Sequence, residues 1–276
     1  MASGELHLAE CLAFLAEQPA GRFDLVYVDP PFNTGKRQRQ RRLKTVRDPE
    51  GDRQGFGGAR YRTEVAGEER GYDDVHEDYL AFLEPRLREA HRVLAPEGAL
   101  FVHLDDREVH YVKVLLDRVF GRDCFQNEII WAYDYGARSK KRWSRKHDSI
   151  LWYTKHPERY CFDHEAMDRI PYMAPGLVGK EKAARGKTPT DVWWHTIVSP
   201  TGKERTGYPN QKPLGILERI VKVHSRPGEL CLDFFAGSGS FGEACARNDR
   251  RFVLVDQNPE AHEVMRTRLS EHLTAG

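Results

Sequence analysis

The stretch from Leu230 to Ala244, LCLDFFAGSGSFGEA, constrains the fold more than any other part of this 276-residue chain. A short apolar run typical of a buried strand ends at Asp233, and a segment with helical periodicity follows it. Between them, Gly237, Gly239 and Gly242 allow the backbone to turn sharply and to come close to a ligand. A strand, a glycine turn and a helix in this order predict an α/β fold that binds a ligand at the carboxyl end of a strand.

The rest of the chain repeats the alternation of short apolar runs with segments of helical period. This pattern predicts an α/β fold with βαβ units, in which a mostly parallel sheet carries helices on both faces. We expect strands near Asp24–Val28, Ala99–Leu104, Ile129–Tyr133, Ser149–Tyr153, Leu230–Phe234 and Phe252–Val255. We expect helices near Asp78–Val93, Glu108–Phe120, Leu214–His224, Ser240–Arg247 and Pro259–His272.

Two regions do not follow this alternation. Residues 33–77 are rich in Gly and Arg and have little apolar periodicity, so we expect a long, mobile, basic loop there. Residues 135–205 are also irregular and hold Trp143, Trp193 and Trp194 among basic residues, so we expect an insertion there. These boundaries leave residues 1–134 and 206–276 as the two parts of one large domain.

Positive charge is clustered although the formal net charge is only +1. The first cluster comprises Lys36, Arg37, Arg39, Arg41, Arg42, Lys44 and Arg47, and the second comprises Arg138, Lys140, Lys141, Arg142, Arg145 and Lys146. A nearly neutral protein with two local basic clusters can bind a polyanion on one face. For either cluster alone, a solvated charged loop is the simpler interpretation.

The cysteines and the apolar runs exclude several classes of protein. The five cysteines include no CxxC pair, which argues against a disulfide framework and against a zinc site, and we expect no metal. The first residues lack a basic segment, and no run approaches 18 uninterrupted apolar residues. We therefore expect no signal peptide and no membrane partner, and a cytoplasmic location.

The glycine turn fits two kinds of cofactor. Gly237, Gly239 and Gly242 satisfy the dinucleotide pattern G-x-G-x-x-G, with Asp256 placed to meet a ribose. However, Asp233 at the end of the strand would repel a diphosphate, whereas it can hold the cationic groups of S-adenosylmethionine. The carboxylate of that cofactor can lie at the N-terminus of the following helix, where free N–H groups favour an anion. A tight turn without a ligand is the alternative interpretation.

A second motif, Asp29-Pro30-Pro31-Phe32, follows the expected strand Asp24–Val28. The prolines fix the backbone and leave their carbonyl groups as acceptors, and the carboxylate of Asp29 is another acceptor. Two fixed acceptors suit an amine with two hydrogens, and the ring of Phe32 can stack on a planar heterocycle. The motif therefore indicates a site for a flat base with an exocyclic amine, although a surface turn is the alternative.

Taken together, the two motifs resemble those of the DNA amino-methyltransferases, which methylate N6 of adenine or N4 of cytosine. The catalytic motif of that family, [D/N/S]-PP-[Y/F/W], matches Asp29–Phe32, and its F-x-G-x-G turn matches Phe235–Gly239. The catalytic motif comes first and the cofactor motif comes near the C-terminus, an order that resembles the β class. The segment Thr206–Pro213, TGYPNQKP, is similar to the family segment TGYPTQKP.

This resemblance implies a circularly permuted, Rossmann-like methyltransferase fold with S-adenosyl-L-methionine as cofactor. The chain departs from the family at three places: Glu10 replaces an Asp, Phe234 replaces a Pro, and Ser240-Phe241 replaces a Thr pair. The implied catalytic residues are Asp29, Pro30, Pro31 and Phe32. The implied cofactor-binding residues are Glu10, Lys212, Asp233, Phe235, Ala236, Gly237, Ser238, Gly239, Ser240, Asp256 and Asn258.

The implied substrate is double-stranded DNA, whose target base must be flipped out of the duplex to reach the site. The basic residues expected to bind DNA are Lys36, Arg37, Arg39, Arg138, Lys140, Lys141 and Arg142, and the insertion 135–205 is the expected target-recognition region. The resemblance also allows a cognate restriction endonuclease and a homodimer as partners.

The resemblance leaves several alternatives open. Aspartate at the first position of the catalytic motif favours N6 of adenine, with N4 of cytosine as the alternative. The more distant alternatives are an RNA methyltransferase, a protein-glutamine methyltransferase, an inactive DNA-binding relative and an NAD-dependent oxidoreductase.

Overall fold

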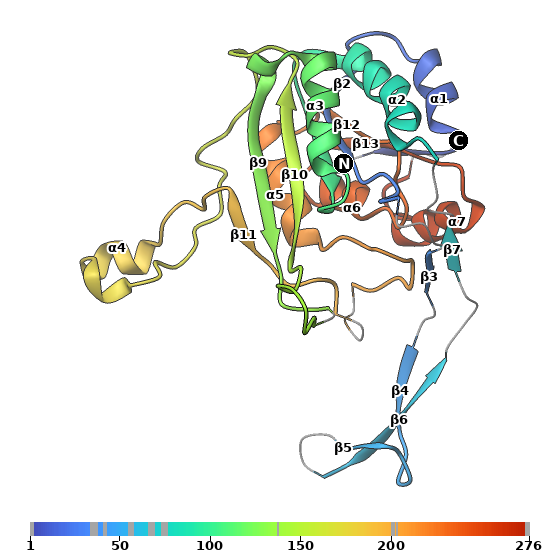
Figure 1. Ribbon diagram of the computed structural model, residues 1–276, viewed down its shortest axis with the longest axis vertical. Helices are drawn as coiled ribbons and strands as arrows, with labels where there is room; N and C mark the ends of the chain where they lie inside the picture. Colours follow the sequence, from blue (N-terminus) through green and yellow to red (C-terminus); the bar gives the residue numbers. More distant parts are fainter. Residues whose placement is uncertain are drawn as a thin grey trace.

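The fold of the protein, described by a computed structural model, is built on a central eight-stranded sheet (Figure 1). The structure describes residues 3–33, 38–40, 43–54, 58–65, 70–72, 77–136, 138–199, 202 and 204–273. The strands of the central sheet are β1 (Gly4–Leu8), β2 (Phe23–Val28), β8 (Leu94–Leu104), β9 (Phe125–Ala132), β10 (His147–Thr154), β11 (Val192–Trp194), β12 (Leu230–Asp233) and β13 (Arg251–Asp256). The helices are α1 (Cys11–Glu17), α2 (Tyr79–Val93), α3 (Val109–Phe120), α4 (Lys180–Arg185), α5 (Leu214–His224), α6 (Ser240–Arg247) and α7 (Pro259–Arg268), with short 3₁₀ turns at Arg122–Cys124 and Pro175–Leu177.

The sheet has the strand order β1-β13-β12-β2-β8-β10-β9-β11. In this spatial order, the four neighbouring pairs β1-β13, β13-β12, β12-β2 and β2-β8 are parallel, and β11 is parallel to β9. Only β10 runs against its neighbours, β8 and β9. The prediction of a mostly parallel sheet is therefore confirmed.

Helices cover both faces of the sheet, as predicted, and each face has its own apolar core. In β2, Val26 and Val28 pack in the core that lies under α1, α2 and α3. Leu25 and Tyr27 point the other way, into the core under α5, α6 and α7. This alternation follows from the two-residue period of a strand. Because both faces of β2 are buried, the strand is apolar almost throughout and was easy to predict.

The helix α2 illustrates why the predicted helices form. Asp78 precedes it, and its carboxylate accepts the backbone N–H of Ala81 at 2.9 Å, which caps the first turn. Its buried residues Leu83 and Leu87 follow helical spacing and face the sheet. The helix continues through Pro85 to Val93.

The prediction that residues 33–77 lack secondary structure is wrong in the described parts of that region. There β3 (Gln38–Gln40) pairs with β7 (Arg70–Tyr72), and β6 (Arg60–Val65) lies between β4 (Leu43–Arg47) and β5 (Arg53–Gln54). These strands form an extension that projects away from the central sheet (Figure 1). None of the side chains described in the extension belongs to either apolar core, and its strands lack the apolar alternation on which the prediction depended.

The sequence did not predict two further elements, and the predicted insertion belongs only partly to a separate projection. The strand β1 and the helix α1 lie near the N-terminus, where we predicted neither. Within residues 135–205, β10 and β11 belong to the central sheet, while the segment that carries α4 projects to one side (Figure 1). The functional division at residues 134 and 205 stays a prediction. Within the described ranges, no helix is long and apolar enough to span a bilayer.

Candidate active site

Three adjacent strands bring three carboxylates to one edge of the sheet. Asp256 is the last residue of β13, Asp233 is the last residue of β12, and Asp29 directly follows β2. Because these neighbouring strands are parallel, their carboxyl ends lie side by side. All three aspartates line one cavity of about 470 Å³. This volume lies within the range of small-molecule sites, roughly 300–1,000 Å³.

The glycine turn forms one wall of the cavity. Asp233 Oδ1 accepts the backbone N–H of Phe235 at 2.9 Å, and Asp256 Oδ2 accepts that of Gly237 at 2.9 Å. Gly237 has a φ of +48° and Gly239 a φ of +73°, in the left-handed region that side chains disfavour. A Cβ atom at Gly239 would also lie 2.9 Å from the side chain of Met265. The turn therefore needs glycine at both positions.

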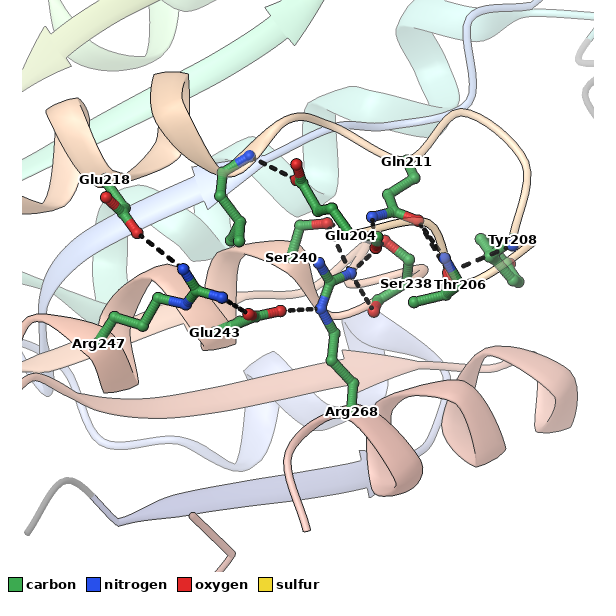
Figure 2. A network of polar contacts seen from close by, with 11 residues as sticks. Glu204, Thr206, Tyr208, Gln211, Glu218, Ser238, Ser240, Glu243, Arg247 and Arg268 are labelled. Carbon is green, nitrogen blue, oxygen red and sulfur yellow. Dashed lines mark hydrogen bonds and ion pairs between the residues drawn. The ribbon is translucent and has the colours of Figure 1, made fainter. Parts of the chain in front are cut away.

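Arg268 from α7 fastens this turn from behind (Figure 2). Its guanidinium donates to the Ser238 carbonyl at 3.1 Å and to Ser240 Oγ at 2.9 Å, and it pairs with Glu243 of α6. Only 6% of the Arg268 side chain is exposed. A buried guanidinium with several acceptors holds its partners in one geometry. The position of the turn thus depends on a residue that the sequence motifs did not indicate.

Burial makes the acids of the cavity unusual. Burial raises the pKa of Asp233 well above its ordinary value, and the neighbouring carboxylates of Asp29 and Asp256 raise it further. Burial also raises the pKa of Asp256, although hydrogen bonds from Asn258 and Gly237 oppose this effect. A carboxylate in such surroundings gains from a cationic partner. The site therefore suits the ammonium group of S-adenosylmethionine and disfavours a diphosphate.

The catalytic motif lies beside this wall and contacts Lys212. The ammonium group of Lys212 pairs with Asp29 Oδ2 and lies 5.0 Å from the centre of the Phe32 ring. The other carboxylate oxygen, Asp29 Oδ1, is buried and has no hydrogen-bond partner among the described residues. A buried acceptor without a donor is costly, so this atom is suited to a donor from a ligand.

Beneath the motif runs a chain of buried polar groups. The Tyr27 hydroxyl lies 2.9 Å from His103 Nδ1, and His103 Nε2 lies 3.2 Å from Asp148 Oδ2. Tyr133 donates from its hydroxyl to Asp148 Oδ1 at 3.1 Å. Burial raises the pKa of Asp148, but the hydrogen bonds from His103 and Tyr133 and the charges of His103 and Lys212 together outweigh it and hold this pKa below its ordinary value. The His103 ring stacks on Phe32 with 6.1 Å between ring centres, so this chain supports the motif.

Glu10 lies at another end of the cavity. Its carboxylate caps α1 by accepting the Ala13 N–H at 2.9 Å, and it pairs with Arg86 at 2.6 Å. Burial raises the pKa of Glu10, but hydrogen bonds from Ala13, Leu12, Cys11 and Arg86 outweigh this effect and lower it. Glu10 therefore stays anionic and faces the cavity as an acceptor.

Most of the predicted residues line this one cavity. Those that do are Asp29, Pro31, Glu10, Lys212, Asp233, Phe235, Ala236, Gly237, Ser238, Ser240, Asp256 and Asn258. Pro30 and Phe32 lie next to it within the catalytic motif, and Gly239 directly precedes α6 as its N-cap. The ammonium group of Lys212 pairs with the catalytic aspartate, and its contact with the cofactor stays a prediction.

The structure describes only some of the predicted DNA-binding residues. Lys36 and Arg37 lie outside the described residues, and Arg39 is described only as a backbone position in β3. Arg138, Lys140, Lys141 and Arg142 are all exposed in the loop between β9 and β10. That loop lies at the same edge of the sheet as Asp29, since Ser149 at the start of β10 pairs with Leu104 at the end of β8.

Sequence reasoning missed several residues of the site. Tyr27, Phe82, Arg86 and Tyr208 line the cavity, and none was assigned a role. A signal was present for Arg86, because it lies on α2 four residues after Phe82 and interrupts an apolar stripe. Its guanidinium lies 3.9 Å over the Phe82 ring. No comparable local signal marks Tyr27, which reads as an ordinary core residue.

Comparison with known proteins identifies the family. A sequence model of the N6/N4 type, described as DNA methylase, matches residues 23–267. The chain belongs to this family. It is 32% identical over 191 residues to the type II methyltransferase M.HpaI of Haemophilus parainfluenzae, which covers 69% of this chain and 59% of that protein. It is 26% identical over 264 residues to the DNA adenine methyltransferase YhdJ of Escherichia coli (strain K12), covering 91% of this chain and 77% of that protein.

Solved structures agree on the fold. The M1.HpyAVI–SAM complex superimposes with a TM-score of 0.62 at 18% identity, covering 96% of this chain and 98% of that one. The cytosine-N4-specific PvuII DNA methyltransferase gives a TM-score of 0.67 at 14% identity, covering 97% and 86%. The predicted family and its Rossmann-like methyltransferase fold are therefore confirmed. The family takes its methyl group from S-adenosyl-L-methionine, as predicted, and the residues of the cavity fit that cofactor.

Proposed function

We propose that this protein transfers a methyl group from S-adenosyl-L-methionine to N6 of a flipped adenine in double-stranded DNA. The observation that carries this proposal is the unpartnered, buried Oδ1 atom of Asp29, which lies in the cavity that the glycine turn also lines. It provides an acceptor for an N–H group beside the place where a methyl donor fits.

The cofactor supplies an electrophilic methyl group on a sulfonium when it is bound. The wall that holds it is formed by Asp233, Asp256 and the turn at Gly237. Asp233 would hold the ammonium group, Asp256 would accept hydrogen bonds from the ribose, and the N-terminus of α6 would hold the carboxylate. Glu10 and Arg86 also line the cavity and would hold the adenine part of the cofactor.

The catalytic motif acts on the amine of the base. An aromatic amine is a weak nucleophile, because its lone pair is delocalised into the ring. Hydrogen bonds from its two N–H groups to Asp29 and to the Pro30 carbonyl favour a tetrahedral nitrogen, which is the geometry needed for attack. Phe32, which His103 supports from below, stacks on the base and orients it. After transfer, the excess proton leaves from the nitrogen to Asp29.

Adenine is favoured over cytosine by the aspartate that opens the catalytic motif. The relative YhdJ is named as a DNA adenine methyltransferase, which supports the same choice. N4 of cytosine is the second candidate, since a protein of that specificity shares the fold. Both bases present an exocyclic amine, so Asp29 and Pro30 would act on either in the same way.

The experiment is mass spectrometry of nucleosides from DNA that was incubated with the protein and labelled S-adenosyl-L-methionine. N6-methyladenine is the expected product. N4-methylcytosine would replace adenine by cytosine as the target, and the absence of any methylated base would refute the proposed function. We also propose that the protein acts in the cytoplasm, where bacteria such as those that carry its relatives keep their DNA. A cognate endonuclease and a homodimer stay predictions.

A further inference from the structure

The most exposed tryptophan of the described residues lies next to the catalytic edge. Trp143 is 95% exposed in the loop that connects β9 to β10, residues 133–146. A tryptophan side chain carries a large apolar surface, and one that stays in water contributes almost nothing to folding through burial. Scattered exposed apolar residues are common, so exposure alone does not indicate a role.

The loop is fastened at its base by hydrogen bonds. The ammonium group of Lys146 donates to the carbonyls of Asp134 and Gly136, both at 3.0 Å. Arg145 pairs with Asp106 at 2.8 Å, which ties the loop to the segment after β8. These contacts fix the two ends of the loop relative to the sheet.

The tip of the loop is also organised, and it holds Trp143 away from the protein. Ser139 Oγ accepts the backbone N–H groups of Lys141 and Arg142, both at 3.2 Å. Ser144 Oγ accepts the N–H of Ser139 at 3.1 Å. Each hydrogen bond joins backbone to a side chain within the loop, as in other compact turns. Trp143 is thus presented by a structured turn.

The direction of the loop is set by strand register. Ala132 at the end of β9 pairs with His147 at the start of β10, and Ser149 pairs with Leu104 at the end of β8. The end of β8 lies beside the end of β2, because Val28 pairs with Val102. The loop therefore projects from the edge that carries Asp29. In Figure 1, the loop and the extension formed by β3 to β7 both project from the same edge of the sheet.

The charges around Trp143 indicate the kind of partner. Arg138, Lys140, Lys141 and Arg142 are exposed in the same loop and precede the tryptophan. Exposed cations next to an exposed aromatic ring match a nucleic acid, whose phosphates pair with cations and whose bases offer faces for stacking. An acidic protein surface could pair with these cations, but it would offer no base to stack on the indole ring of Trp143.

We infer that Trp143 inserts into the DNA duplex at the target site and stacks where the flipped base has left. This inference rests on the proposed function, because only a protein that flips a base opens such a space. The cations of the loop then hold the phosphates on both sides, and the ring replaces the stacking that the target base loses. Proteins that kink or open DNA often insert apolar side chains between base steps in this way.

The test compares Trp143→Ala with wild type on two duplexes of the sequence that the protein methylates. In one duplex the target base is paired, and in the other it faces an abasic site, which lowers the cost of flipping. Stacking of a base on an aromatic ring contributes about 1–3 kcal/mol, so we expect kcat/KM to fall about 5- to 150-fold on the paired duplex. On the abasic duplex, the variant should come within about threefold of wild type, because the unpaired target base leaves the helix at a much lower cost and depends less on an inserted side chain.

Two further variants serve as controls. Trp143→Phe keeps a ring and should retain most of the activity on the paired duplex. Trp194→Ala removes another exposed tryptophan, at the end of β11, and any loss should be the same on both duplexes. An equal loss for Trp143→Ala on both duplexes would overturn the inference, as would no loss on either.

A second measurement does not depend on methyl transfer. The difference in fluorescence between wild type and Trp143→Phe isolates the emission of Trp143. We expect duplex DNA to protect this emission from quenching by acrylamide, and unchanged quenching would overturn the inference. If duplex DNA protects Trp143 but wild type methylates no DNA, the proposed function fails while the DNA-binding role of the loop stands.

Discussion

The role of Asp233 can be tested by Asp233→Asn, which removes the charge and keeps the shape. In wild type, Asp233 Oδ1 accepts the N–H of Phe235 at 2.9 Å. The amide oxygen of Asn can accept the same N–H group, so the glycine turn should keep its geometry. The side chain is only 3% exposed, and burial raises its pKa well above the ordinary value. The substitution therefore isolates the effect of one buried negative charge.

The expected loss of cofactor affinity follows from the charge. A hydrogen bond between charged groups contributes about 1.5–3 kcal/mol, so the Kd for S-adenosyl-L-methionine should rise about 10- to 150-fold. At a cofactor concentration of 100 times the wild-type Kd, binding stabilises wild type by about 2.7 kcal/mol. A variant with 30-fold weaker binding would gain only about 0.9 kcal/mol at that concentration.

Without cofactor, the same substitution should stabilise the protein. The pKa of Asp233 is raised in the folded state, so this group favours folding most at low pH and loses that contribution as the pH rises through its folded pKa. Each unit of the upward shift corresponds to about 1.4 kcal/mol lost at higher pH. Once the pH is high enough for folded Asp233 to be ionised, removing the charge should thus raise the Tm of the ligand-free protein by about 2–4 °C for each 1 kcal/mol regained.

The assay is thermal unfolding of wild type and Asp233→Asn between pH 6 and pH 9, with and without cofactor, supported by calorimetric titration. Asp24→Asn is the matched control, because burial also raises the pKa of Asp24 but this residue lies at the start of β2, away from the cavity. That control should leave the affinity for the cofactor unchanged. Unchanged affinity in Asp233→Asn would refute the assigned cofactor contact, and a less stable ligand-free variant would refute the electrostatic reasoning.

Four other changes test the remaining parts of the site. Asp29→Ala should lower methyl transfer at least about 1,000-fold, because it removes a group that stabilises the transition state. Calorimetry should still show cofactor binding within about threefold of wild type. Normal turnover would contradict the catalytic role of Asp29. Lys212→Met breaks a buried ion pair and should lower the free energy of unfolding in urea by about 3 kcal/mol, with recovery in the double variant that adds Asp29→Asn. Arg268→Met should loosen the glycine turn and weaken cofactor binding, measured by calorimetry, about tenfold, which corresponds roughly to the free energy of one charged hydrogen bond. Unchanged binding would show that the turn keeps its geometry without Arg268. Replacing Lys140 and Lys141 by Ala should lower the slope of log K against log salt by about 1.8 in a DNA-binding titration, and an unchanged slope would exclude them from phosphate contacts.

The parts of the fold that sequence could predict are those with strong local signals. The helices α5 and α6 have the bounds that apolar periodicity predicted, Leu214–His224 and Ser240–Arg247. The edge strand β1, GELHL, was missed because it carries exposed and half-buried residues instead of a continuous apolar run. The strands β3 to β7 were missed because their sequences lack the apolar alternation of strands that pack on a core.

The site shows the same division between local and distant information. The catalytic motif and the glycine turn each carry their chemistry within a few residues, so both could be located from sequence. The pairing of Lys212 with Asp29 joins residues that are 183 positions apart, and only the fold brings them together. The support of Phe32 by His103, and of the glycine turn by Arg268, likewise depends on the packing of distant elements.

The topology explains why the cavity forms between β12 and β2. From β2 the chain passes through α2, on one face of the sheet, to the neighbouring strand β8. From β12 it passes through α6, on the opposite face, to β13 on the other side. The two connections leave the sheet in opposite directions, so a crevice opens at the carboxyl ends of β12 and β2, where open α/β sheets bind ligands. The catalytic motif is near the beginning of the chain and the cofactor motif is near its end. Even so, Asp29 follows β2 and Asp233 ends β12, and these two strands are adjacent. The permuted order therefore leaves the two halves of the site as neighbours, with the amine acceptor on one side of the crevice and the cation-binding acid on the other.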